Sequence, residues 1–181
     1  MRKALFFLGC MSEPDVEWIV RNGARRQLAK GAILIEEGRP TDSLFFLLSG
    51  RLAVSTRAAG VVASLETGEV VGEISFVDSR PPTASVAALV DCEIGVVPRR
   101  QLTAKLSQDL AFAAHFYQAI AIFLADRLRT ATANVGGKGV KLSEDVEDED
   151  ELAGHLLDTL SMAGSRFSDM QRRPWGESTS S

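Results

Sequence analysis

The sequence is poor in the residues that build metal and redox sites. It contains two cysteines and two histidines in 181 residues. Cys10 and Cys92 lie far apart without a paired spacing, which suggests neither a disulfide framework nor a zinc site and favours a reducing, cytoplasmic compartment. His115 and His155 fall on predicted helices with no second ligand at metal spacing, so we expect packing or surface roles for both.

Three functional classes also lack their usual signals. No Gly-x-Ser-x-Gly, His-Glu-x-x-His or Cys-x-x-Cys motif is present, and we expect a protein that is not an enzyme. The net charge of −4 gives no broad basic field, so direct DNA binding is not expected. No run approaches the roughly 18 apolar residues of a membrane helix, and we expect no membrane association.

Short β-rich runs dominate the first hundred residues, after one predicted helix. Ser12, with Pro14 and Asp15 behind it, is typical of a helix start, and Gly23 should end that helix. The β-rich runs cover residues 32–36, 44–48, 52–56, 61–65, 70–71, 84–89 and 93–97. Glycines that separate them predict tight corners with positive φ, at Gly31, Gly38, Gly50, Gly60, Gly68 and Gly72. Many short strands indicate a β-roll or jelly roll.

After Pro98 the apolar spacing becomes helical. We predict a short helix over residues 99–107 and a long one over 109–133. Residues three and four apart place one stripe on the long helix: Phe112, Phe116, Ala119, Phe123 and Arg127. Periodicity leaves two readings open, which are packing on the chain's own barrel and a homodimer through Phe112, Phe116 and Phe123.

The C-terminal quarter begins with a glycine-rich hinge at residues 134–139. Seven of the nine residues from 143 to 151 are acidic, which indicates a solvated linker. An amphipathic helix should follow and end before Pro174. Its apolar stripe is Leu152, Leu156, Leu160, Ala163, Phe167 and Met170. We expect this helix to fold back on the domain, with a partner protein as the alternative.

These signals predict a mainly β fold with flanking helices: a double-stranded β-roll or jelly roll with an N-terminal helix and a long C-terminal helix. The expected organisation is an N-terminal helical segment (1–30), a β-roll core (31–98), the short and long helices (99–135), the hinge and acidic run (136–151), and the amphipathic helix with a disordered tail (152–181).

The most specific motif is VVGEISFVDSRPPTASVAAL, at residues 70–89. A Gly-Glu pair is followed by a turn, a proline and Thr-Ala-Ser-Val. The motif resembles the phosphate-binding cassette of cyclic-nucleotide-binding domains, which reads Gly-Glu and then Pro-Arg-x-Ala-[Ser/Thr]-Val. The matching positions are Gly72, Glu73, Pro81, Ala84, Ser85 and Val86. The resemblance extends over about residues 12–130 and is to the β-roll domains of catabolite activator proteins and cyclic-nucleotide-dependent kinases.

The resemblance implies that cAMP, cGMP or another small anion binds here, although no cofactor is certain. Glu73 matches the residue that accepts the ribose 2′-hydroxyl. Backbone N–H groups at the start of a short helical turn, and donors in the Thr-Ala-Ser segment, would hold the phosphate. The ligand-binding residues expected on this basis are Gly72, Glu73, Ile74, Ser75, Arg80, Pro82, Thr83, Ala84 and Ser85.

One position departs from the family pattern. Pro82 replaces the arginine that pairs with the phosphate, and proline offers neither charge nor N–H. A hydrogen bond to a charged group contributes about 1.5–3 kcal/mol, so its loss should weaken binding about ten- to 150-fold. Arg80 is a candidate replacement, with a solvent-facing arginine as the alternative. Glu73, likewise, could serve only as a structural brace.

The expected function is a non-enzymatic regulatory module that senses cAMP, cGMP or another small anion and signals through its C-terminal helices to an unidentified protein partner. Two alternatives stay open. Pro82 favours a ligand-free β-roll scaffold for protein–protein interaction or dimerisation. Resemblance alone supports a relative of transcription regulators that acts with a separate DNA-binding chain. The residues after Val135 lack the several helices and basic side chains of a helix-turn-helix, which favours a stand-alone domain.

Overall fold

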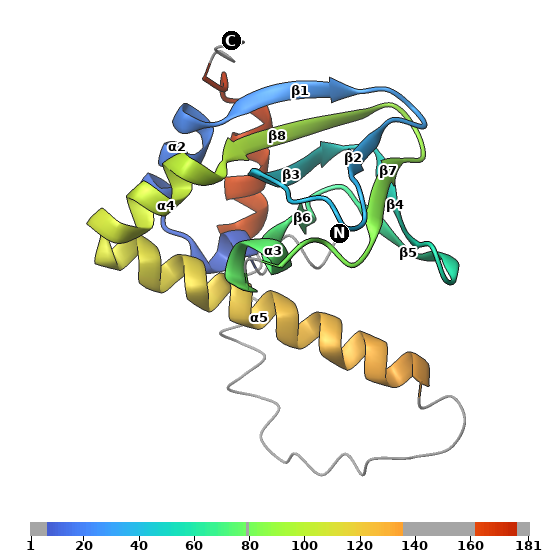
Figure 1. Ribbon diagram of the computed structural model, residues 1–181. Helices are drawn as coiled ribbons and strands as arrows, with labels where there is room; N and C mark the ends of the chain where they lie inside the picture. The colour runs from blue at the N-terminus through green and yellow to red at the C-terminus, as the bar shows by residue number, and fades with distance from the viewer. Residues whose placement is uncertain (1–6, 79, 136–161, 177–181) are drawn as a thin grey trace.

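Two antiparallel sheets face each other and form a roll whose one side is covered by helices (Figure 1). The computed structural model describes residues 7–78, 80–135 and 162–176. The strand order is β1-β8-β3-β6 in the first sheet and β2-β7-β4-β5 in the second. This architecture confirms the predicted β-roll with flanking helices.

The strands are β1 (Ala24–Leu28), β2 (Ile33–Ile35), β3 (Ser43–Ser49), β4 (Arg51–Thr56), β5 (Gly60–Glu66), β6 (Val70–Val71), β7 (Ser85–Ala88) and β8 (Cys92–Pro98). The helices are α2 (Glu13–Asn22), α3 (Glu73–Asp78), α4 (Arg99–Gln108) and α5 (Leu110–Val135), and residues 7–10 and 162–172 are also helical.

Strand β3 separates two hydrophobic cores. Its alternate residues Leu44, Phe46 and Leu48 pack with the helices, whereas Phe45 and Leu47 point between the two sheets. Side chains of a strand alternate between faces, so an apolar run without alternation is required when both faces are buried. The second sheet differs, because its edge strand β5 buries only Leu65.

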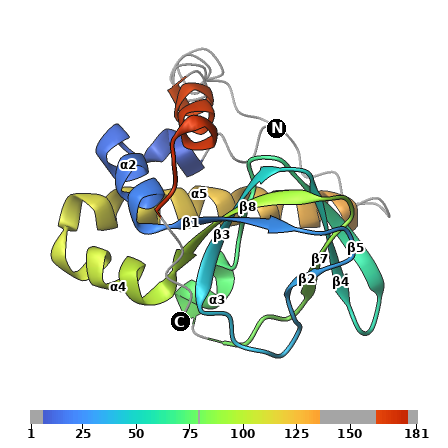
Figure 2. The ribbon, with the colours of Figure 1, turned by 90° about the horizontal axis from the view of Figure 1, so that it is seen from above.

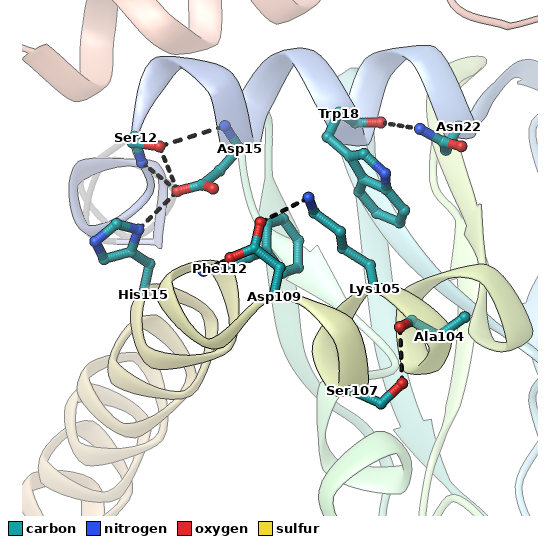
Figure 3. A network of polar contacts seen from close by, with 10 residues as sticks. All are labelled: Ser12, Asp15, Trp18, Asn22, Ala104, Lys105, Ser107, Asp109, Phe112 and His115. Carbon is teal, nitrogen blue, oxygen red and sulfur yellow. Dashed lines mark hydrogen bonds and ion pairs between the residues drawn. The ribbon is translucent and has the colours of Figure 1, made fainter.

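The N-terminal helix α2 begins as the sequence predicts. Ser12 and Asp15 form a reciprocal capping box, in which the Ser12 backbone N–H donates to Asp15 Oδ2 at 2.7 Å. The same carboxylate oxygen lies 2.8 Å from Nδ1 of His115 on α5, which joins the two helices (Figure 3). The His115 side chain is partly exposed and makes this polar contact between α5 and α2. His155 lies outside the described residues.

Helices α4 and α5 match the two predicted helices. The stripe residues Phe112, Phe116, Ala119 and Phe123 are at most 1% exposed within the single chain. Phe112 packs against Trp18, and Phe116 packs against Phe7 and Phe76. The stripe therefore packs on the chain's own domain, so the three phenylalanines are not available to a homodimer interface. The Arg127 side chain is outside the described part.

The C-terminal segment, residues 162–176, folds back on the roll as expected. Its helix lies beside α2 in both views and ends before Pro174 (Figures 1 and 2). Ala163 and Met170 are fully buried, and Trp175 packs at 6.5 Å between ring centroids against Phe46. The predicted stripe residues Leu152, Leu156 and Leu160, and the hinge and acidic run (136–151), lie outside the described residues.

One strand was not predicted. Strand β1, Ala24–Leu28, lies within residues 1–30, which the sequence analysis treats as helical, and it pairs with β8 from Ala24↔Val96 to Leu28↔Cys92. Its burial pattern explains the miss, because only Leu28 is buried and the three residues before it are exposed. The predicted glycine corners are confirmed, since all six adopt φ between 69° and 103°.

Candidate ligand-binding cavity

A cavity of about 200 Å³ opens between the cassette and the inner faces of the two sheets. The cassette contributes Gly72, Glu73, Ile74 and the segment 80–84. Its floor is aliphatic and comes from both sheets, at Ile35, Val54, Leu65, Val71 and Val86. The site is therefore an apolar hollow with a few polar groups along one wall, the usual composition of a small-molecule pocket.

Gly72 turns the chain from β6 into α3 and has to be glycine. Its φ is +94°, and a Cβ there would lie 2.9 Å from the Ser43 carbonyl oxygen. The next residue, Glu73, opens α3 and is 1% exposed although it lines the cavity. A buried carboxylate needs polar partners, so this side chain is held in place at the cavity wall.

Arg80 and Pro82 both line the cavity. The Arg80 backbone N–H donates to Asp78 Oδ1 at 3.0 Å, and its side chain belongs to no ion pair among the described residues. The Pro82 carbonyl accepts from Gly38 N–H at 2.8 Å, which fastens the segment to the turn between β2 and β3. An arginine is therefore among the lining residues at position 80, whereas position 82 is a proline.

The Thr-Ala-Ser segment divides into lining and bracing residues. Thr83 and Ala84 line the cavity. Ser85, expected to bind ligand, is not among the lining residues, and its Oγ accepts from the Glu37 backbone N–H at 3.0 Å. The structure therefore gives Ser85 a bracing contact to the β2–β3 turn. Ser75 belongs to α3, but its side chain is outside the described part.

Sequence reasoning missed the aliphatic floor and Asp78. The floor residues belong to five different strands and converge only after the two sheets pack face to face. Their inward positions on predicted strands were the only available signal, and that signal does not distinguish a cavity wall from ordinary core.

The opposite side of α3 faces the helical layer. Phe76 packs edge-on against Phe116 of α5 at 5.5 Å between ring centroids. Arg99 of α4 places its guanidinium 5.1 Å from the Phe76 ring centre and donates to the Phe76 carbonyl at 3.2 Å. The helix that borders the cavity is therefore in direct contact with both α4 and α5.

Two other kinds of function receive no support from the described residues. None of their His, Cys, Asp and Glu side chains gather in groups of three or more that could hold a metal ion. No described helix combines the length and the hydrophobicity needed to cross a membrane.

The comparisons with known proteins identify a domain that contains the cassette. The family described as cyclic nucleotide-binding domain matches residues 25–109. The cGMP-dependent protein kinase egl-4 of Caenorhabditis briggsae is 30% identical over 157 residues, which are 83% of this chain and 20% of the kinase. The chain thus spans about a fifth of the length of this curated relative.

Solved structures share the fold. A cyclic nucleotide-binding domain from Methylobacillus flagellatus superposes with a TM-score of 0.67 at 21% identity, over 78% of this chain and 85% of that one. The catabolite activator protein of Thermus thermophilus gives 0.57 at 21% identity, over 88% and 84%. The cassette and the roll thus lie within the residues that the family model matches, and residues 25–109 form a domain of the cyclic nucleotide-binding domain family.

Proposed function

We propose that the cavity binds a cyclic nucleotide, with cAMP and cGMP as the candidates, and that the chain is a non-enzymatic regulatory module. The main support for this proposal is Glu73, a carboxylate with 1% exposure on the wall of a largely aliphatic cavity. A carboxylate is a strong acceptor for a ribose hydroxyl, and aliphatic walls suit a purine face.

The phosphate would lie against the cassette. Thr83 and the backbone around Ala84 line the same cavity, and Arg80 is the cation at its border. Because Pro82 provides no charge, we expect binding about ten- to 150-fold weaker than with an arginine at that position, unless Arg80 replaces it.

The readout would run from α3 to the helical layer. Ligand at Glu73 bears on α3, and α3 contacts α5 through Phe76 and Phe116 and α4 through Arg99. A ligand shifts these helices only if it binds their two arrangements with different affinity.

We propose a cytoplasmic location for the protein. Both cysteines are free thiols, as is usual in a reducing compartment.

A homodimer through α5 would use a different face from the phenylalanine stripe. Exposed or half-buried residues follow one another at spacings of four and three, which is the heptad pattern of a coiled coil. This seam consists of Leu110, Ala114, Tyr117, Ala121, Leu124 and Leu128. Its apolar character and self-complementary spacing favour a second copy of the chain as the partner.

The seam is tested by sedimentation at increasing concentration. Ala121→Glu should shift the protein to monomer, whereas Ala111→Glu, at another exposed position that is not part of the seam, should leave the association unchanged. A wild-type protein that stays monomeric at all concentrations would rule the dimer out.

The scaffold alternative rests on Pro82 and predicts no response to nucleotide. Isothermal titration with cAMP and cGMP up to millimolar concentration separates the two functions. Glu73→Gln keeps the shape of the side chain and should abolish measurable binding. The matched control Glu66→Gln, on exposed strand β5, should bind like wild type. The absence of heat and of any thermal shift with either nucleotide would contradict the sensor proposal.

The alternative of a transcription-regulator relative that acts with a separate DNA-binding chain is supported only by similarity of fold, and we do not propose it.

The sharpest variant restores the missing residue. Pro82→Arg should tighten binding about ten- to 150-fold, because it adds a bidentate partner for the phosphate. Pro82→Ala is the control for removal of the proline ring and should not tighten binding. Arg80→Ala should weaken wild-type binding if Arg80 serves as the counter-ion, and should have no effect in the Pro82→Arg background if the restored arginine takes over.

A further inference from the structure

Trp175 occupies a slot that two glycines keep open. A Cβ on Gly95 of β8 would lie 2.2 Å from Trp175 Cη2, and one on Gly23 would lie 2.7 Å from Cζ3. Neither glycine has a positive φ. Space for the indole, and not backbone conformation, therefore requires glycine at these two positions. The indole Nε1 donates to the Met170 carbonyl at 3.0 Å, so the buried ring is also satisfied.

Polar contacts surround the buried Trp175 side chain. Arg166 donates to the carbonyls of Leu8 and Gly9, both at 3.1 Å, and Gln171 donates to the Leu48 carbonyl at 2.5 Å. Arg25 donates to the Gln171 carbonyl. An apolar centre with a polar rim is the composition of a protein–peptide interface, in which a few buried residues supply most of the affinity.

These contacts connect the C-terminal segment to the first half of the chain. The Gly176 N–H donates to the Val20 carbonyl at 3.2 Å, and Gly176 also forms a parallel bridge with Ala24 at the edge of the first sheet. The segment is therefore attached to the outer side of that sheet, on the opposite face from the ligand cavity.

A row of aromatic contacts nevertheless joins the Trp175 slot to α3. Trp175 contacts Phe46 at 6.5 Å, Phe46 contacts Phe7 at 5.8 Å, and Phe7 contacts Phe116 at 5.7 Å between ring centroids. Phe116 in turn contacts Phe76 of α3 at 5.5 Å. Rings in a close-packed core cannot shift singly, so a displacement at one end must be accommodated by its neighbours.

We propose that residues 162–176 are a removable ligand of the chain's own roll, anchored by Trp175, and that their docking is coupled to the position of α3. Release of this segment from the outer side of the first sheet requires only local opening, while the core between the sheets stays folded. The coupling is reciprocal, so whatever moves α3 also changes the docking of the segment. The tests below use no nucleotide, so their outcome is independent of what the cavity binds.

Docking is tested by the fluorescence of Trp175. The sequence has two tryptophans, so Trp18→Phe leaves Trp175 as the sole emitter. In that background Gly95→Ala should push the indole out of its slot, with red-shifted emission and several-fold stronger acrylamide quenching, while the far-UV spectrum stays that of the folded roll. Unchanged emission and quenching would overturn the docking site. In a Trp175→Ala background, Gly95→Ala should cost no further stability.

Coupling is tested by hydrogen exchange in α3. Trp175→Ala should accelerate exchange of the Phe76 amide, which bonds to the Gly72 carbonyl, about five- to tenfold. Leu28→Ala is the control for loss of stability in general, because Leu28 is buried in the core between the sheets and belongs neither to the segment nor to the aromatic row. Equal exchange of α3 in the two variants would overturn the coupling. Should Trp175→Ala fail to fold, Gly95→Ala allows the same comparison with the tryptophan retained.

Discussion

The two faces of the sheet β1-β8-β3-β6 are buried in different ways. The face toward the second sheet is almost entirely aliphatic, with Phe45 as its only buried aromatic ring among the described residues, and it leaves a cavity. The face toward the helices is rich in aromatic rings, with Phe7, Phe46, Phe112 and Phe116 in mutual or chained contact.

The difference separates two tasks that share one sheet. Aliphatic residues that meet at the hollow leave space for a ligand, whereas interlocked rings leave little freedom for independent movement. Helix α3 lies at the border, with Glu73 toward the cavity and Phe76 toward the rings. Substitutions on the aromatic side should therefore destabilise the folded state more than substitutions on the cavity side.

The largest effect is expected for Phe116→Ala. Phe116 is fully buried and contacts four aromatic rings, so its truncation should lower the free energy of unfolding by about 3–5 kcal/mol in a urea titration. Tyr117→Ala, on the neighbouring half-exposed residue, is the control and should cost far less. Similar losses for the two variants would show that the aromatic side is not closely packed.

The second-largest difference between the two faces is expected when a side chain is enlarged. Ala119→Leu adds volume to a fully buried position on the helical side and should destabilise by about 1–3 kcal/mol. Val86→Ile adds one methylene at the cavity and should be nearly neutral, while it reduces the space for ligand. Thermal unfolding of both variants measures this difference in stability. A Val86→Ile variant that is destabilised as much as Ala119→Leu would contradict it.

A smaller effect is expected where polar groups anchor the helical layer. Ser12→Ala removes the α2 cap and a donor to Asp15, and should destabilise by about 1 kcal/mol. Ser12→Asn, which can still cap the helix, should lose less. Equal losses for the two substitutions in chemical denaturation would argue that the cap contributes nothing.

The smallest effect should depend on pH. A hydrogen bond from Lys105, followed by the Phe112 backbone N–H, lowers the pKa of Asp109 below its ordinary value of 3.8 (Figure 3). A depressed carboxyl pKa stabilises the folded state above the ordinary value, and this contribution is lost as pH falls through the folded pKa. Asp109→Asn should therefore lower the melting temperature slightly at pH 7 and not at pH 2. A difference that persists at pH 2 would contradict the charge effect.

Local chemistry made much of the fold predictable. The corner glycines, the Ser12 cap and the apolar stripe of α5 each depend on neighbouring residues, and each was recovered. Strand β1 was missed because an edge strand with exposed Arg25, Arg26 and Gln27 carries no apolar alternation. The slot for Trp175 could not be predicted, because Gly23 and Gly95 reveal their role only when a distant ring arrives.

The candidate site, like the fold, could be predicted in part from the sequence. The cassette motif located Glu73 and the segment 80–84 at one cavity. Ser85 shows where motif reasoning stops, since its hydroxyl accepts from the backbone of Glu37, a residue 48 positions away. Such contacts depend on how the β2–β3 turn meets β7, which no local pattern encodes.

Strand β3 carries a risk of misfolding that follows from its burial on both faces. Sliding its pairing by one residue would exchange Phe45 and Leu47 with the residues that face the helices, yet every exchanged side chain would still be buried. Hydrophobicity therefore does little to reject the wrong register. The corner at Gly50 directly after β3 does require one residue type, because φ is +103° and a Cβ would lie 2.5 Å from Cys92 Sγ. A residue without a side chain thus fixes the point at which β3 ends and β4 begins.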